Sequence, residues 1–164
     1  MSTKYTFLRD DTLLQTMTEN AQTLLLNNVL LLMNTNAAYS PAGTTSTTLV
    51  MAGYGKTFTP QKTGRVLIIL YANVNNNTAG DGVQAVLSYG PGTPPAAGAA
   101  VTGLPTGGTA KVTSAAAGAS GEVVLATVLV GLTVGTTYWL DVAYSAITGG
   151  TATISIIYAA VIEF

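Results

Sequence analysis

The fold of this chain is indicated most clearly by residues 137–144, which read TYWLDVAY. In a β-strand, successive side chains point to opposite faces of the sheet. The alternation puts Tyr138, Leu140, Val142 and Tyr144 on one face, and Trp139, Asp141 and Ala143 on the other. The stretch therefore predicts a strand that packs one face against a core.

Similar segments lie on both sides of this stretch, separated by turns rich in Gly, Pro and Asn. The longest is residues 65–74, RVLIILYANV, which a turn containing Asp81-Gly82 follows. The other expected strands are residues 47–54, 56–59, 83–89, 109–113, 122–130, 136–147 and 151–164. Seven or eight strands with no helical pattern between them predict an all-β fold, an antiparallel β-sandwich over residues 47–164. The strand number and turn spacing suit a jelly roll best.

Residues 1–34 have a different pattern, which predicts a mainly helical segment in front of the sandwich. Thr12 and Gln15 are spaced as in a capping box at the start of a helix. Alternating steps of three and four residues, typical of a coiled-coil seam, then connect Leu14, Met17, Ala21, Leu24, Asn28 and Leu31. An Asn in such a seam fixes register and strand number. We expect these six residues to anchor or oligomerise the protein, with residues 35–46 as a linker.

Residues 24–33, LLLNNVLLLM, leave two other interpretations open. In a helix, the apolar residues of this segment would lie all round its surface. The second half of the helix could therefore be buried against the body of the protein. Asn27-Asn28 could also be the turn of a β-hairpin. The capping box and the good helix formers before Leu24 favour the helix.

The composition excludes several classes of function. The 164 residues include no His and no Cys, so no His-dependent triad, thiol nucleophile or ordinary zinc site can be built. Six Lys and Arg against seven Asp and Glu leave a net charge of -1 and no basic block for nucleic acid. The N-terminus lacks the apolar region of a secretory signal, and residues 24–33 are too short to cross a bilayer. Charged residues make up only 8%, which favours a surface packed against other subunits.

One segment has part of a phosphate-binding motif. Residues 53–57, GYGKT, contain the GKT of such a loop, but Val50 stands where the motif needs its first Gly. Pro60 follows, where the motif needs a helix whose N-terminus binds phosphate. The segment predicts a strand with a glycine kink and no nucleotide site.

No other chemical site is expected. The carboxylates of Asp81, Glu122, Asp141 and Glu163 are not spaced as a glycosidase pair, and Asp141 is expected on a solvent-facing side of its strand. No run of acidic residues suits calcium, so we predict no metal, no cofactor and no catalytic residue. An aromatic platform for sugars could be drawn from Tyr89, Tyr138, Trp139, Tyr144 and Tyr158, but packing inside a sandwich is the more usual role of such rings.

Several stretches carry a resemblance to structural proteins of tailed bacteriophages. They are residues 64–69 (GRVLII), 75–82 (NNNTAGDG), 87–92 (LSYGPG), 131–143 (GLTVGTTYWLDVA) and 149–155 (GGTATIS). The resemblance covers roughly residues 53–164 and is a pattern of turns and strands. It implies a jelly-roll module, often trimeric, displayed on a virion as a capsid decoration (cement) protein, a head fibre or the tip of a tail fibre. It carries no catalytic signature.

Two functions follow from the resemblance as expectations. The first is a non-enzymatic, trimeric capsid decoration protein whose partners are its own copies and the major capsid protein or other virion subunits. The second is a tail-fibre or tail-tip module that binds a host surface receptor through the loops at residues 75–82 and 90–108. Both place the protein in the virion, without a nucleic-acid or membrane partner.

Overall fold

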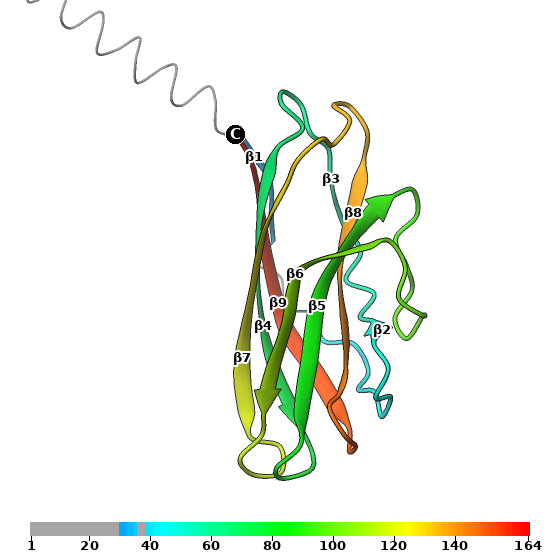
Figure 1. Cartoon of the computed structure of the whole chain (residues 1–164), viewed down its shortest axis with the longest axis vertical. Helices are drawn as coiled ribbons and strands as arrows, with labels where there is room; N and C mark the ends of the chain where they lie inside the picture. The colour runs from blue at the N-terminus through cyan, green and yellow to red at the C-terminus, as the bar shows by residue number, and fades with distance from the viewer. Residues whose placement is uncertain (1–29, 36–38) are drawn as a thin grey trace, which may run out of the picture. The chain divides into compact units, whose positions relative to one another are not determined.

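The computed structural model describes residues 30–35 and 39–164, which form nine strands in two antiparallel sheets (Figure 1). The strands are β1 (Leu30–Thr35), β2 (Val50–Met51), β3 (Lys56–Phe58), β4 (Val66–Asn76), β5 (Gly82–Pro91), β6 (Leu104–Thr113), β7 (Ser120–Leu129), β8 (Tyr138–Ala146) and β9 (Ala152–Glu163). The described part of the chain contains no helix, and so none that could span a membrane. The all-β prediction is confirmed.

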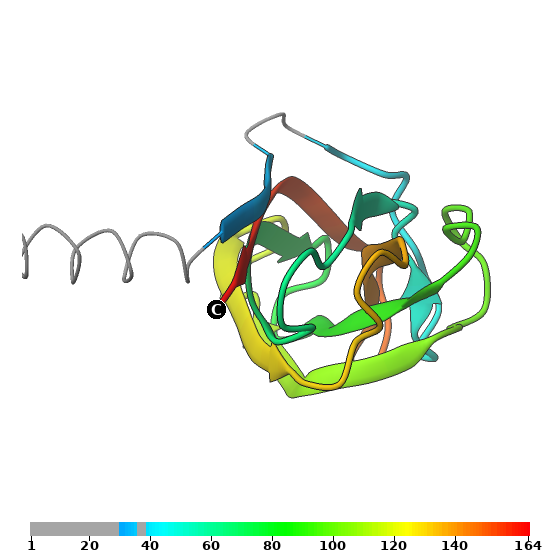
Figure 2. The same ribbon diagram turned by 90° about the horizontal axis from the view of Figure 1, so that it is seen from above.

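The two sheets pack face to face as a β-sandwich. Sheet A has the strand order β1-β9-β4-β7, and sheet B has the order β2-β8-β5-β6, with β3 also pairing with β8. Seen from above in Figure 2, the strands of the two sheets surround the space that the core side chains fill. The long central strands β4, β5, β8 and β9 therefore position most of the core.

Strand pairing in the sandwich is nested along the chain. β5 pairs with β6, β4 with β7, β2 and β3 with β8, and β1 with β9. The first half of the chain thus pairs with the second half in reverse order, as the two arms of one long hairpin do. The further pairs β4 with β9 and β5 with β8 then join its two halves into the two sheets.

The core is built from the side chains that point between the two sheets. Every second residue of β4 is fully or almost fully buried, whereas every residue of β8 from Trp139 to Ala146 is buried. The main cluster joins Val66, Ile68, Leu70, Ala72 and Val74 of β4 with Leu140, Val142 and Tyr144 of β8. Burial of this apolar area is the main stabilising contribution, at about 25 cal/mol per Å².

The sandwich begins earlier than the predicted boundary at residue 47. Residues 30–35, expected as the end of the helix and the start of the linker, are strand β1 and pair with β9. This strand adds one to the eight expected, so the described residues contain nine. Leu and Met are compatible with either structure, and the free edge of β9 decides in favour of a strand. The rest of the predicted helix, residues 12–29, lies outside the described residues.

Sheet A contains a β-bulge that the sequence analysis did not predict. Tyr71 of β4 pairs with Tyr158, but Asn73 pairs with Ser155, so β9 has one extra residue between the two pairs. Ile156, in the bulge, has a φ of 52°. The extra residue reverses the alternation of β9, so that Tyr158 faces outward and Glu163 faces inward. The doublet Ile156-Ile157 was the only signal of it in the sequence.

The left-handed backbone at Ile156 leads to a testable prediction. A β-branched residue at positive φ is strained by about 1–2 kcal/mol, and glycine removes this strain. We expect Ile156→Gly to leave the free energy of unfolding unchanged or to raise it by up to about 1 kcal/mol. Leu104→Gly, at an exposed strand position without positive φ, should instead destabilise by about 1 kcal/mol. Equal destabilisation of both variants in denaturant titrations would contradict the strained backbone.

Candidate functional site

The three buried carboxylates of the described chain hold loops in place. Glu163, at the end of β9, is fully buried and accepts backbone N–H bonds from four successive residues, Gln61 to Gly64, at 2.7–2.9 Å. Burial alone would raise the pKa of Glu163, but these four donors together lower it to about 2. The carboxylate is therefore ionised and saturated with donors, and it has no role left for chemistry.

Asp141 does not face solvent as the sequence analysis expected. Its side chain is fully buried on β8, on the outer face of sheet B. It accepts backbone N–H bonds from Gly53 and Tyr54, both at 3.0 Å, and from Val142 at 2.7 Å. Burial raises its pKa to about 6 despite these donors. The carboxylate fixes the turn between β2 and β3, which contains the GYGKT segment.

Asp81 has the same kind of role in the turn before β5. It accepts N–H bonds from Gly82 at 2.7 Å and also from Thr148 and Gly149. Burial opposes ionisation, but the donors outweigh it and lower the pKa of Asp81. The side-chain amide of the neighbouring Asn76 donates to the carbonyls of Gly82 and Gly149. The loop at residues 75–82 is therefore tied to the turn between β8 and β9.

The GYGKT segment has no phosphate-binding geometry. Lys56 begins strand β3, and its ammonium group lies 5.9 Å from the ring centroid of Tyr54. The backbone N–H groups of Gly53 and Tyr54 donate to Asp141, so neither is available to an anion. Gly53 and Gly55 have positive φ values and lie between β2 and β3, so the predicted glycine kink is a turn between two short strands.

The long loop between β5 and β6 covers the outer face of sheet B. Strands extend into the predicted loop of residues 90–108 from both ends, which leaves residues 92–103. Ala99 and Val101 of this loop pack on a second apolar cluster, made of Met51, Val86, Trp139 and Ala143. The Trp139 indole N–H donates to the carbonyl of Pro91 at 3.1 Å. Strands β5 and β8 of sheet B are thus buried on both faces.

Most of the rings that could have formed an aromatic platform instead pack inside the protein, as expected. Trp139 and Tyr144 are buried, and Tyr89 and Tyr138 pack against the main cluster. Tyr158 lies on the outer face of sheet A, where it meets Tyr71, which was not part of the possible platform. No local pattern joins the two tyrosines, because 87 residues separate them in the sequence.

The outer face of sheet A is apolar over three rows of paired residues. Across β7, β4 and β9, the rows are Val128–Leu67–Ile162, Ala126–Ile69–Ala160 and Val124–Tyr71–Tyr158. We call these nine residues the apolar face. Val124 and Val128 are 64% and 51% exposed, and no member of the apolar face is charged. The next row, Glu122–Asn73–Ser155, is polar and marks one end of the apolar face.

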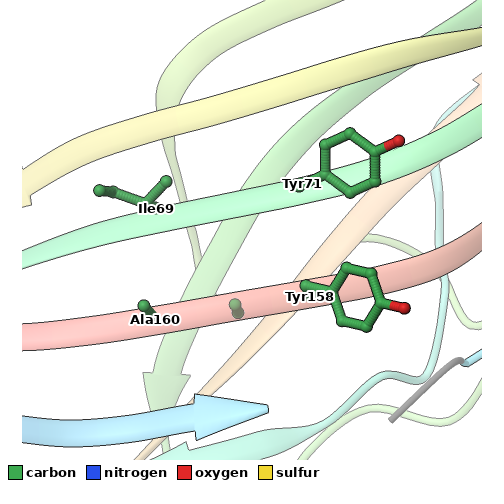
Figure 3. A pocket seen from close by; sticks show the side chains of 5 residues that line it. Ile69, Tyr71, Tyr158 and Ala160 are labelled. Carbon is green, nitrogen blue, oxygen red and sulfur yellow. The ribbon is translucent and has the colours of Figure 1, made fainter. Parts of the chain in front are cut away.

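A shallow hollow lies within the apolar face (Figure 3). It is lined by Ile69, Tyr71, Tyr158, Ala159 and Ala160. The two tyrosine rings are nearly parallel, at an angle of 18° with centroids 6.1 Å apart, and Figure 3 shows them side by side with their faces toward the viewer. The Tyr71 hydroxyl donates to Glu122 at 2.9 Å, and this bond raises the pKa of Tyr71. The small side chain of Ala160 leaves the hollow open beside them.

Of the six predicted seam residues, the structure describes Leu31 alone. Leu31 lies in strand β1 with 56% of its surface exposed, so its assignment to a helical seam is wrong. Leu14, Met17, Ala21, Leu24 and Asn28 lie outside the described residues. Their role as an anchor stays a prediction.

No group of three or more acidic residues, and hence no candidate metal centre, occurs within residues 30–35 and 39–164. Neither protein-family models nor curated proteins match the sequence. The apolar face is therefore the feature of the described chain that best fits a functional site.

Proposed function

We propose that this chain is a non-enzymatic structural protein of a tailed-bacteriophage virion, a trimeric capsid decoration protein built on a jelly roll. Its partners would be copies of itself and the major capsid protein or other virion subunits. The resemblance of residues 53–164 to such modules supports the proposal. So does the strand pairing, because nested pairs rolled into two sheets are the pattern expected of a jelly roll.

The single observation that carries the proposal is the apolar face. A soluble monomer rarely exposes a contiguous apolar patch, and one that is exposed usually marks a contact with another protein. Here nine uncharged residues form such a patch on one sheet. The buried carboxylates add support, since Asp81, Asp141 and Glu163 all bind loop backbone. A structural role requires only contact surfaces such as the apolar face.

The alternative is a tail-fibre or tail-tip module that binds a host receptor. The paired rings of Tyr71 and Tyr158 favour it, because adjacent coplanar rings can stack on the apolar faces of sugars. Glu122 and Asn73, at the polar end of the same face, could accept and donate hydrogen bonds to hydroxyl groups. The two aliphatic rows of the apolar face lie on the other side of the tyrosine rings from the polar row. They cover a larger area than the rings, and an aliphatic area of this kind fits contact with another protein better.

Immunogold labelling of purified virions tests the proposal. We expect an antibody raised against residues 47–164 to label the head at many sites, because a decoration protein repeats over the capsid surface. Labelling confined to the tail end would instead support the receptor-binding alternative. Absence of label from intact and partly disrupted virions alike would contradict both functions. Preimmune serum on the same particles is the control.

A further inference from the structure

Strand β4 has the sequence of a strand buried on both faces. Residues 66–72 read VLIILYA, a continuous apolar run of the kind found in strands covered on both sides. The sandwich core covers only its inner face, through Val66, Ile68 and Leu70. On the outer face, Leu67, Ile69 and Tyr71 have no covering element among the described residues, whereas loop 92–103 covers the outer face of sheet B. The apolar residues on the outer face of β4 therefore indicate a cover that lies outside the described residues.

We infer that the apolar face of sheet A is the contact between copies of this chain, with the β7 edge of one copy packed into the hollow of the next. This inference rests on the proposed trimer and names the surface that holds it together. The occupant of the face is thus a second copy of the same chain.

The shape of the face supports contact between copies. Val124 and Val128 of β7 are 64% and 51% exposed, and we call this pair the ridge. The hollow beside Tyr71 and Ala160 lies across β4 and β9 (Figure 3). Ridge and hollow are different parts of one surface, so this surface can be complementary to the same surface of a second copy. Valine side chains are small enough to enter a hollow floored by alanine.

Charge and chain connection point to the same occupant. The face has no charged member and the chain has a net charge of -1, so identical copies repel one another little. β1 is an edge strand of sheet A, next to β9, and five of the six predicted seam residues precede it in the sequence.

The absence of cysteine from the chain allows a direct test by thiol labelling. Val124→Cys puts one thiol on the ridge, and Leu104→Cys puts one on β6 at a matched 60% exposure. Cysteine is close to valine in size, so assembly should survive. In full-length assembled protein, we expect a maleimide to react at least about tenfold more slowly with Val124→Cys than with Leu104→Cys. The two rates should become equal in denaturant.

The molecular mass of each variant, measured by light scattering, separates the two proposals. A trimer with a protected thiol at position 124 supports the inference. A trimer in which both thiols react equally fast overturns it and leaves the proposed trimer intact. A monomeric wild-type chain at all concentrations overturns the trimer and the inference together. Val128→Cys, on the same ridge, repeats the measurement and should give the same protection.

Mutation of the hollow gives a second, independent readout. Ala160→Phe fills the hollow without touching the ridge, and we expect it to raise the concentration at which the trimer dissociates by at least about tenfold. Leu104→Phe, on sheet B, should not change that concentration. Equal dissociation of Ala160→Phe, Leu104→Phe and wild type would show that the hollow is not a contact.

Discussion

Replacement of Asp141 by alanine is expected to lower the free energy of unfolding by about 3–5 kcal/mol, the largest effect predicted for a single side chain here. Its carboxylate accepts N–H bonds from Gly53, Tyr54 and Val142 in a fully buried site. A buried N–H that loses its acceptor costs about 1–3 kcal/mol. The variant leaves three such groups, and it also creates a cavity beside them.

Asp141→Asn separates the loss of charge from the loss of contacts. Asparagine keeps one acceptor oxygen, so we expect it to be less destabilising than alanine. Its amide group would face one of the N–H donors and cannot replace that bond. Burial already raises the pKa of Asp141 to about 6, so removal of the charge recovers part of the desolvation cost.

Denaturant unfolding at fixed protein concentration measures these effects. Trp139, the single tryptophan of the chain, neighbours Asp141 and reports by fluorescence. Glu122→Ala is the matched control, because its exposed carboxylate should contribute less than about 1 kcal/mol. If Asp141→Ala lost no more stability than Glu122→Ala, the carboxylate would not be what fixes the turn between β2 and β3.

Glu163→Gln is expected to cost about 2–4 kcal/mol at neutral pH. The carboxylate of Glu163 accepts N–H bonds from Gln61, Lys62, Thr63 and Gly64. Glutamine has the same shape but no charge, and its amide group would face the Gln61 N–H. Successive backbone N–H groups form an anion-binding concavity that suits a carboxylate far better than an amide.

The pH dependence of this cost has a defined sign. The pKa of Glu163 is about 2 in the folded protein and 4.5 for an ordinary glutamate. A lowered pKa gives stability that is fully present above pH 4.5 and is lost as the pH falls toward 2. The difference between wild type and Glu163→Gln should therefore shrink over this range. Titration of Asp141 affects both proteins equally and cancels from the difference.

Unfolding titrations of the two proteins between pH 7 and 2 test this prediction. Glu122→Gln serves as the control, and its difference from wild type should stay small throughout. A Glu163→Gln difference that stays constant down to pH 2 would mean that the site does not lower the pKa of Glu163. No difference at neutral pH would mean that the four N–H groups have other acceptors.

The N-terminal part of the sandwich could not be assigned from local pattern. Leu30, Leu31 and Leu32 fit a helix as well as a strand, and the capping box at Thr12 favoured a helix throughout. Residues 30–35 become a strand because β9 has a free edge to pair with. That edge is formed by residues more than a hundred positions further along the chain.

The candidate site was missed for a related reason. The outward residues of β4 were visible as part of an apolar run, but their neighbours on β7 and β9 are about 50 to 95 residues away. The direction in which Tyr158 points also depends on one extra residue, Ile156. Without the bulge, the same sequence would place Tyr158 inside the core.

The sequence by itself determined the secondary structure of the sandwich and the kind of chemistry open to it. Alternation along residues 137–144 and the turns rich in glycine are local properties, so strand type followed from them, as did the lack of His and Cys ligands. Only the tertiary structure decided where the carboxylates lie. Asp141 meets Gly53 across 88 residues, and Glu163 meets Gln61 across 102. A buried charge is stable only where such distant donors converge on it, and no local pattern records that convergence.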